Sequence, residues 1–253
     1  YEIVDCDWSS DVCSSDLPFL AANFPRVYVD VNRSPGELDP ALFGPLASGA
    51  SPASEFTGTG RPASDTGARS ARVAVGLGVI PRIVRDGLEI YGHKLDRAEA
   101  EFRLNAFYKP YHAMLRELIG ETLERFGVAI VVDCHSMPSP PKRSDIVLGD
   151  RYGDSASGEL MAIAQSALAS LNFDVARNAP YAGGYTTALY GRPRAGVHAL
   201  QIEINRDLYW DDAAMEKNPA FDTLRNRLYF FAERLLAQSS AVLPPQDRLR
   251  AAE

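Results

Sequence analysis

Apolar residues along the chain predict two long strands that end in polar side chains. In the first, residues 128–138, a β-branched run gives way to Asp133, Cys134 and His135 and then to proline. A run of this kind, bounded by turn formers, is typical of a buried strand. Because ligands of open α/β sheets bind beyond the carboxyl ends of the strands, we expect His135 at the mouth of a site; a hydrogen-bonded core histidine is the alternative. Alternation places Cys134 on the face opposite His135, where we expect a buried, inert thiol.

The second long strand, residues 197–206, has one apolar and one polar face. Leucine and isoleucine occupy the first face, whereas the other carries Gln201, Glu203 and Asn205. A strand with this alternation lines a polar cavity or faces water. His198 shares the apolar face, so we interpret it as structural.

Shorter strands and helices complete the predicted architecture. Strands are expected at residues 24–31, 73–84, 88–91, 145–150 and 173–177, and helices at residues 94–126, 158–171 and 221–237. Pro110 either kinks the first helical segment or starts a second helix, and His112 is assigned to the helix surface or to packing. Gly127 then leads into the first long strand. Helices that alternate with strands predict an α/β fold.

Some residues stand outside this pattern. Residues 1–17 nearly repeat Ser-Ser-Asp without any helical or strand period, so they are either a native flexible end or, as we favour, a segment foreign to the domain. We expect one domain over residues 18–240, incomplete on its N-terminal side, and a polar tail over residues 241–253. Residues 48–70 are rich in Ser, Gly, Ala, Thr and Pro, and are expected to be either a functional lid or a disordered loop.

Composition narrows the class of function. The chain has 253 residues, of which 46% are hydrophobic and 23% charged, enough for one domain with a sizeable core. The net charge of -7 and the absence of a basic cluster argue against nucleic-acid binding. No apolar run approaches the ~20 residues that span a bilayer. Three cysteines without a secretory signal favour a reducing cytoplasm, and small-molecule chemistry is the expected function.

Candidate chemistry gathers at the predicted strand ends. His135 and Glu203 form a candidate pair of metal ligand and general base. Arg33 follows the strand expected at residues 24–31, and a guanidinium there could bind a carboxylate. The glycine-rich segment 178–187 lacks the spacing of a dinucleotide or Walker motif, and its Tyr185 is a candidate ligand-binding group. One histidine does not make a catalytic zinc site, which normally has three protein ligands.

Five blocks of sequence together resemble the N-formylglutamate amidohydrolase family. They occur in the family's order, span residues 18–233, and comprise residues 29–35, 133–138, 145–150, 181–187 and 201–206. The resemblance implies a phosphorylase/hydrolase-like fold, a three-layer α/β/α sandwich with a central mixed sheet, distantly similar to zinc carboxypeptidases. It also implies hydrolysis of N-formyl-L-glutamate to L-glutamate and formate in histidine degradation.

The same resemblance implies roles for individual residues. One zinc ion is expected as the cofactor, with His135 as a ligand. Glu203 is expected to take a proton from the attacking water and pass it to the leaving amine. The residues expected to bind the small anionic substrate are Asn32, Arg33, Tyr185, Thr186, Asn205 and Arg206.

One part of the family pattern is missing from this sequence. Family members carry a Pro-His-Ser-Gly-type segment and an acidic residue upstream, which resemble two further metal ligands, but here no histidine precedes His93. Acidic residues within positions 1–17 could offer oxygen ligands: Asp5, Asp7, Asp11 and Asp16. Two alternatives therefore stay open. The chain could be a related zinc amidohydrolase or carboxypeptidase for another N-acyl amino acid, or a metal-free, inactive fragment. The oligomeric state is left open as well.

Overall fold

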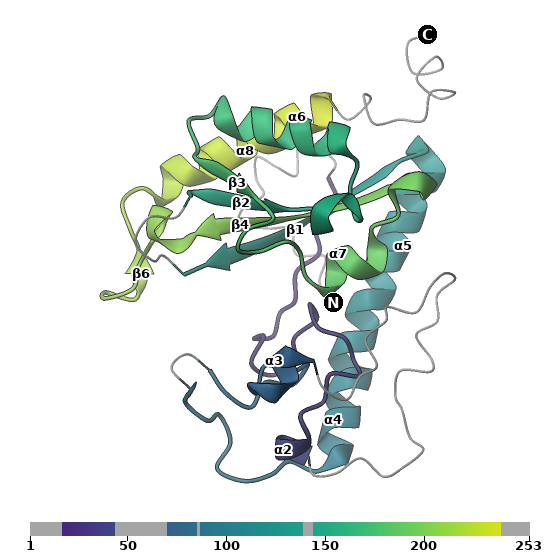
Figure 1. Ribbon diagram of the computed structural model, residues 1–253, viewed down its shortest axis with the longest axis vertical. Coiled ribbons are helices and arrows are strands. Elements are labelled where there is room, and N and C mark those ends of the chain that lie inside the picture. The colour runs from purple at the N-terminus through teal and green to yellow at the C-terminus, as the bar shows by residue number, and fades with distance from the viewer. Residues whose placement is uncertain (1–16, 44–69, 85–86, 139–143, 239–253) are drawn as a thin grey trace. The chain divides into compact units, whose positions relative to one another are not determined.

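The computed structural model describes residues 17–43, 70–84, 87–138 and 144–238 (Figure 1). Its described residues fall into two compact units, the first covering residues 19–117 and the second residues 17–18 and 118–238. We describe each unit separately. None of the helices in the described ranges is long and apolar enough to cross a membrane.

A four-stranded mixed sheet is the centre of the second unit. Its strands, in spatial order, are β1 (Ala129–Met137), β4 (Val197–Asn205), β2 (Ile146–Gly149) and β3 (Val175–Arg177). The β1–β4 and β2–β3 pairs are parallel, whereas β2 and β4 are antiparallel. Both long strands therefore lie where the apolar runs predicted them. The expected α/β class with a mixed sheet is confirmed.

Two glycines set the register where β1 and β4 begin. Gly127 and Gly196 both have positive φ angles, 71° and 77°. A Cβ atom on Gly196 would lie 2.9 Å from the Gly127 carbonyl oxygen, and the Ala129 amide donates to the Gly196 carbonyl at 2.9 Å. Since only glycine fits such a left-handed, crowded position without strain, these two residues fix where the strands start to pair.

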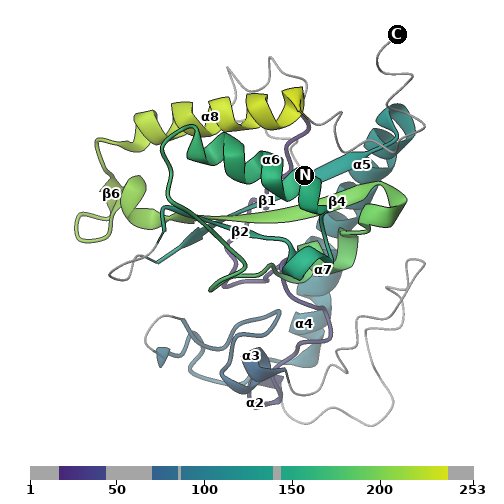
Figure 2. The same ribbon diagram turned by 45° about the horizontal axis from the view of Figure 1, so that its top comes forward.

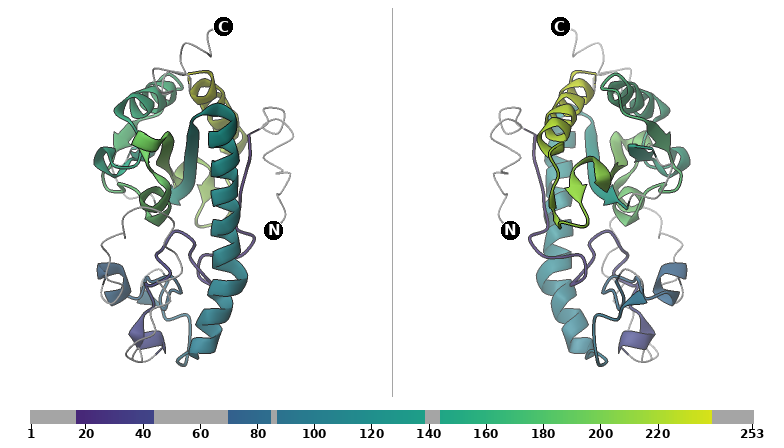
Figure 3. Two further views of the ribbon diagram at one scale, coloured as in Figure 1. Left: turned by 90° about the vertical axis from the view of Figure 1, so that its right-hand side faces the viewer. Right: turned by 90° about the vertical axis from the view of Figure 1, so that its left-hand side faces the viewer.

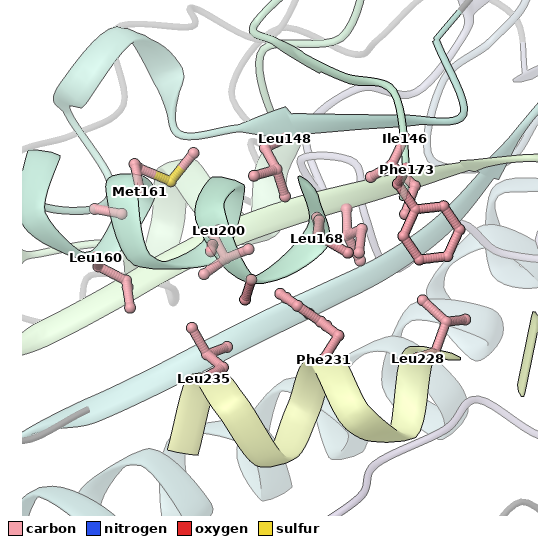
Figure 4. Packing of buried hydrophobic residues seen from close by; sticks show 14 of the residues in the cluster. Ile146, Leu148, Leu160, Met161, Leu168, Phe173, Leu200, Leu228, Phe231 and Leu235 are labelled. Carbon is pink, nitrogen blue, oxygen red and sulfur yellow. The ribbon is translucent and has the colours of Figure 1, made fainter. Parts of the chain in front are cut away.

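Helices α6 (Gly158–Ala169) and α8 (Phe221–Ala237) cover one face of this sheet (Figures 2 and 3). Ser157 caps α6 by accepting the Leu160 amide at 3.2 Å. Figure 4 shows how the apolar sides of the helices and strands pack together. The labelled members of this core are Ile146, Leu148, Leu160, Met161, Leu168, Phe173, Leu200, Leu228, Phe231 and Leu235.

The other face of the sheet carries α7 (Tyr185–Tyr190), which packs on β4 (Figure 2). Helices on both faces agree with the three-layer arrangement expected. Short elements complete the unit: η5 (Arg151–Gly153), η6 (Pro193–Ala195), η7 (Arg206–Leu208), β5 (Trp210–Asp211) and β6 (Glu216–Lys217).

The first unit is mainly helical. Its elements are α2 (Pro40–Phe43), α3 (Ala71–Ala74), α4 (Arg97–Arg103), the π-helical turn η4 (Leu104–Tyr108) and the first half of α5 (Lys109–Phe126). The last three follow one another without a break. Pro110 lies in the first turn of α5, directly after the wider π turn. The helix continues through this position, and its hydrogen-bond pattern changes there from π to α.

Three predicted strands, at residues 24–31, 73–84 and 88–91, are absent from the described part of the first unit; the last contributes only an isolated bridge between Glu89 and Ile83. Residues 24–31 form a turn, in which the Tyr28 amide donates to the Pro25 carbonyl at 2.9 Å. The segment 73–84 begins inside α3, and the positive φ of Gly76 follows directly. Local hydrogen bonds and a glycine turn the chain in the first two of these segments, so their valines do not form an extended strand. In β1 of the second unit, the expected burial of the Cys134 thiol is wrong, because this side chain is exposed.

Several predictions concern residues outside the described ranges. They are the segment 1–17, apart from Leu17, the loop 48–70, apart from Ser70, and the tail 241–253.

The packing of α8 allows a direct test of the core. Replacing buried Phe231 by alanine should lower the free energy of unfolding by about 3–5 kcal/mol, because it leaves a cavity between α8 and the sheet. The neighbouring Phe230 is 52% exposed, so Phe230→Ala is the matched control and should change that free energy by about 0.5 kcal/mol or less. Equal losses for both variants, measured by urea unfolding, would contradict this packing.

Candidate functional site

The polar face of the sheet brings the two central candidates together. His135 on β1 is the register partner of Glu203 on β4, and Asp133 is the partner of Gln201. Partners in a parallel pair present their side chains to the same face. The prediction that the two strands contribute to one site is therefore supported by their pairing, which the sequence does not specify.

Antiparallel β2 completes this face on the far side of β4. Glu203 lies opposite Val147, and Gln201 lies opposite Gly149. The face is thus a grid of two rows. One row runs Asp133, Gln201 and Gly149; the next runs His135, Glu203 and Val147.

Two short polar contacts order this grid. Asp133 Oδ1 lies 3.0 Å from His135 Nε2, and both side chains are 12% exposed. The Gln201 amide donates from Nε2 to Glu203 Oε1 at 2.7 Å, in an environment where Gln201 is 5% and Glu203 8% exposed. Buried polar side chains are held in place by such bonds. The site therefore presents an ordered carboxylate beside an imidazole.

The loop before α7 lies directly against this face. A Cβ atom on Gly149 would lie 2.7 Å from the Ala182 carbonyl carbon, so the loop backbone occupies the space that a side chain would fill. The Arg151 amide donates to the Ala182 carbonyl at 2.7 Å. Predicted site residues Tyr185 and Thr186 follow at the start of α7; Thr186 is buried and Tyr185 half-buried. The glycine-rich segment is thus a loop that leads into a helix beside the polar face.

Asp150, directly after β2, is bonded to the two residues that lead from β3 into this loop. Its buried carboxylate accepts from Arg177 Nη2 at 3.0 Å and from Asn178 Nδ2 at 2.6 Å. Asn178 Oδ1 accepts the Asp150 amide in return at 3.0 Å. Left-handed backbone at Arg151 and Tyr152 follows, with φ angles of 53° and 58°. Consecutive left-handed, non-glycine residues are costly and persist only where the surroundings enforce them; here the Arg151 amide donates to the Ala182 carbonyl and the Tyr152 amide to Asn178 Oδ1 at 3.5 Å.

The first unit holds Asn32 and Arg33 through a separate set of bonds. The Asp30 carboxylate accepts the Asn32 amide at 2.9 Å and Arg26 Nη2 at 2.8 Å. Arg33 donates from Nη1 to the Asn32 carbonyl at 2.9 Å and from Nε to the Leu77 carbonyl at 3.3 Å. Burial lowers the pKa of the Arg33 guanidinium below its ordinary value, and Asp30 opposes this effect. Arg33 is thus a partly desolvated cation held in one orientation.

Helix residues fix the backbone around this cation. Tyr108 donates its hydroxyl to the Arg33 carbonyl at 2.8 Å, and His112 lies with Nε2 at 2.9 Å from the Val31 carbonyl. A carbonyl oxygen only accepts, so Nε2 is the protonated nitrogen of the His112 ring. His112 is fully buried. It is therefore a packing residue, one of the two roles expected for it.

Asn205 and Arg206 lie just after the polar end of β4. The Asn205 side chain accepts the Asp207 amide at 3.1 Å and so caps η7. Arg206 Nη1 lies 3.7 Å from Asp212 Oδ1 in the segment that leads from β5, and both side chains are more than one third exposed. An ion pair of this length and exposure contributes little to stability. Arg206 can therefore exchange this partner for a ligand carboxylate at small cost.

The described residues supply one imidazole but not a complete metal site. Within the described ranges, no three His, Cys, Asp or Glu side chains form a group that could hold a metal ion. The Asp133–His135 contact is nevertheless of the kind that orients metal-binding histidines, in which a carboxylate holds one ring nitrogen. Asp5, Asp7, Asp11 and Asp16 lie outside the described residues.

Comparison with known proteins assigns this chain to a family. The family model of N-formylglutamate amidohydrolase matches residues 3–210. The chain belongs to the N-formylglutamate amidohydrolase family. The matched range includes β1, β4 and every residue of the polar face.

Individual members of the family agree with this assignment. A crystal structure of N-formylglutamate amidohydrolase from Ralstonia eutropha JMP134 is 33% identical, with a TM-score of 0.72, and the match covers 85% of this chain and 74% of that one. The N-formylglutamate deformylase of Pseudomonas putida is 26% identical over 213 residues, and that of Pseudomonas aeruginosa is 28% identical over 202 residues. These matches cover 81% and 77% of this chain but 68% and 65% of the relatives. The chain thus spans about two thirds of the curated relatives' length.

Sequence reasoning missed three residues that order the polar face and the loop against it. Gln201 was placed on the correct face but given no role, because its bond to Glu203 depends on side-chain conformation. Gly149 was not singled out, although it ends a buried strand and directly precedes an acidic residue. Asp150 could have been found from its position directly after an apolar strand, because a carboxylate that is buried there needs a hydrogen-bond partner.

The close approach at Gly149 gives a test of how this loop is held. Gly149→Ala should lower the free energy of unfolding by about 1–3 kcal/mol, because its Cβ atom would overlap the Ala182 backbone. Gly158 has nothing within 4 Å of the equivalent position, so Gly158→Ala is the control and should be neutral or stabilising by up to about 1 kcal/mol. Unfolding in urea measures both. An unchanged Gly149→Ala protein would mean that the loop does not lie against β2.

His198 predicts a pH dependence of stability. It lies on the apolar face, where Nδ1 accepts the Ser157 amide at 3.1 Å, as its structural assignment predicted. Burial lowers the His198 pKa from 6.5, against a smaller opposing effect of Glu159. The unfolded chain therefore takes up a proton near pH 6.5 that the folded protein binds only at lower pH. Stability should fall as the pH decreases below 6.5.

This contribution can be isolated with His198→Gln. The free energy of unfolding of the wild-type protein should fall more steeply between pH 7.5 and 5 than that of the variant, which lacks the titrating ring. His93 is exposed, so His93→Gln is the control and should follow the wild-type curve. Parallel curves for wild type and His198→Gln would contradict the lowered pKa of His198 in the folded protein.

Proposed function

We propose that this protein hydrolyses N-formyl-L-glutamate to L-glutamate and formate, as an enzyme of histidine degradation that uses zinc. The observation that carries the proposal is the pairing of His135 with Glu203 on one polar face, in a chain of the N-formylglutamate amidohydrolase family. The curated relatives, named N-formylglutamate deformylase, support this substrate. A cytoplasmic location remains the expectation.

Glu203 is proposed as the general base and acid. Hydrolysis adds water to the formyl carbon and breaks its bond to nitrogen, so one proton must leave the water and one must reach the departing amine. A carboxylate that is ordered and largely shielded from solvent is suited to move that proton. Glu203 meets both conditions, since Gln201 holds one of its oxygens and it is 8% exposed.

Zinc is proposed as the cofactor, with His135 among its ligands. A bound zinc ion would supply Lewis-acid chemistry, because it polarises a carbonyl oxygen and makes water acidic near neutral pH. Asp133 supports the choice of His135, since it would orient the ring. Since no group of three such ligands lies within the described residues, at least one further ligand would come from beyond them.

Cationic and polar side chains are proposed to bind the rest of the substrate. Arg33 and Arg206 would each hold a carboxylate, and a partly buried guanidinium such as Arg33 forms stronger bonds to an anion than one in water. The groups proposed to orient the substrate are Asn32, Tyr185, Thr186 and Asn205.

The test begins with the 253-residue chain, prepared with zinc and then dialysed. We expect about one zinc per chain and release of formate from N-formylglutamate, with slower turnover of N-acetylglutamate and of other N-formyl amino acids. A preference for another acyl amino acid would assign a different substrate. Protein without retained zinc and without turnover would contradict the proposal.

The same preparation tests Glu203. Glu203→Gln should keep the fold and zinc content of the wild type but lower kcat by about 10²–10⁴-fold, because a carboxamide cannot shuttle the proton. Circular dichroism and metal analysis of the variant separate loss of chemistry from loss of structure. Wild-type turnover in this variant would remove Glu203 from the mechanism.

A further inference from the structure

Gln201 lies at the centre of the polar face without a role in the family assignment. Its neighbours in the sheet are Asp133 on one side and Gly149 on the other, with Glu203 next along the same face of β4. Gly149 has no side chain, and the Ala182 backbone lies above it. Gln201 is therefore enclosed between Glu203 and the loop that leads to Tyr185.

The bond to Glu203 determines which way the Gln201 amide points. An ionised carboxylate only accepts hydrogen bonds, so the group that faces Glu203 Oε1 at 2.7 Å must be the amide NH₂. The carbonyl oxygen Oε1 of Gln201 is then directed elsewhere on the same face. A side chain held in this way cannot exchange its two ends without breaking the bond to Glu203.

That carbonyl oxygen is buried and has no hydrogen-bond partner among the residues that the structure describes. Gln201 as a whole is only 5% exposed. The adjacent Asp133 carboxylate, when ionised, cannot donate to it. Buried polar atoms are nearly always paired, and an exception of this kind inside a candidate site indicates a missing donor.

N-acyl amino dicarboxylates have one donor that matches this oxygen. At neutral pH both carboxylates and the acyl oxygen only accept, so the amide N–H is the molecule's single hydrogen-bond donor. We propose that Gln201 accepts this N–H on its carbonyl oxygen while its NH₂ group positions Glu203, an inference that rests on the proposed function. Gln201 then distinguishes N-acyl amino acids from analogues that lack the N–H.

This contact would also place the scissile bond. Oε1 and Nε2 belong to one rigid, planar amide, so a nitrogen bound to the first lies close to the carboxylate bound to the second. The nitrogen that must receive a proton as the C–N bond breaks is thereby held beside Glu203. One side chain aligns the acid and the leaving group, which is the kind of positioning that raises kcat.

A pair of unreactive ligands tests the contact without relying on turnover. N-Methanesulfonyl-L-glutamate keeps the N–H, whereas 2-(methylsulfonylmethyl)glutarate replaces it with CH₂ at the same charge. Calorimetry on the zinc-loaded wild-type protein should show at least about tenfold tighter binding of the first. In Gln201→Leu this preference should fall to about one. Gln165→Leu makes the same substitution in α6, away from the polar face, and should retain the preference.

Kinetics on the same proteins separate this inference from the proposed function. Gln201→Leu should lower kcat for N-formylglutamate and raise KM, whereas Gln165→Leu should resemble the wild type. An N–H preference that persists in Gln201→Leu would overturn the inference even if hydrolysis occurs. Wild-type protein that shows the preference but no hydrolysis of any acyl amino acid would instead overturn the proposed function.

Discussion

The parallel pairing of β1 with β4 is the constraint on which the site depends. It is set where the strands begin, at two glycines whose left-handed backbones touch so closely that no side chain fits between them. From that point the register brings His135 beside Glu203 and Asp133 beside Gln201. Because alternate residues face opposite sides of a sheet, the same register places Leu200 and Ile202 in the core under α6 and α8. The register of β1 and β4 thus determines both the packing of the core in the second unit and the arrangement of its polar face.

Much of the second unit could be predicted from periodicity alone. β1, β4, α6 and α8 have regular patterns of apolar residues, and α8 begins and ends at the residues expected. The first unit was less predictable because its turns depend on side chains that bond to the backbone. Asp30 is the clearest case, since its carboxylate binds the Asn32 amide and folds a valine-rich segment that otherwise resembles a strand.

The candidate site was predictable in its chemistry but not in its arrangement. His135 and Glu203 were recognisable as polar residues on apolar strands, and alternation along one strand already put Asp133 on the same side as His135. Which strands are neighbours is a different kind of information, since β1 and β4 are separated in sequence by β2 and β3. The functions suggested for Gln201 and Gly149 depend on that neighbourhood, which no local pattern contains.

The two-sided character of β4 limits how this protein can change over evolutionary time. Losing or gaining one residue between Gly196 and Glu203 would turn the rest of the strand over, so that Glu203 would be buried beneath α6 and an isoleucine would take its place opposite His135. Point substitutions can be tested by selection one at a time, but such a shift would remove core and chemistry together. We therefore expect the length of β4 to be kept during evolution. Chimaeras with other members of the family should exchange the whole strand, together with the glycine that precedes it.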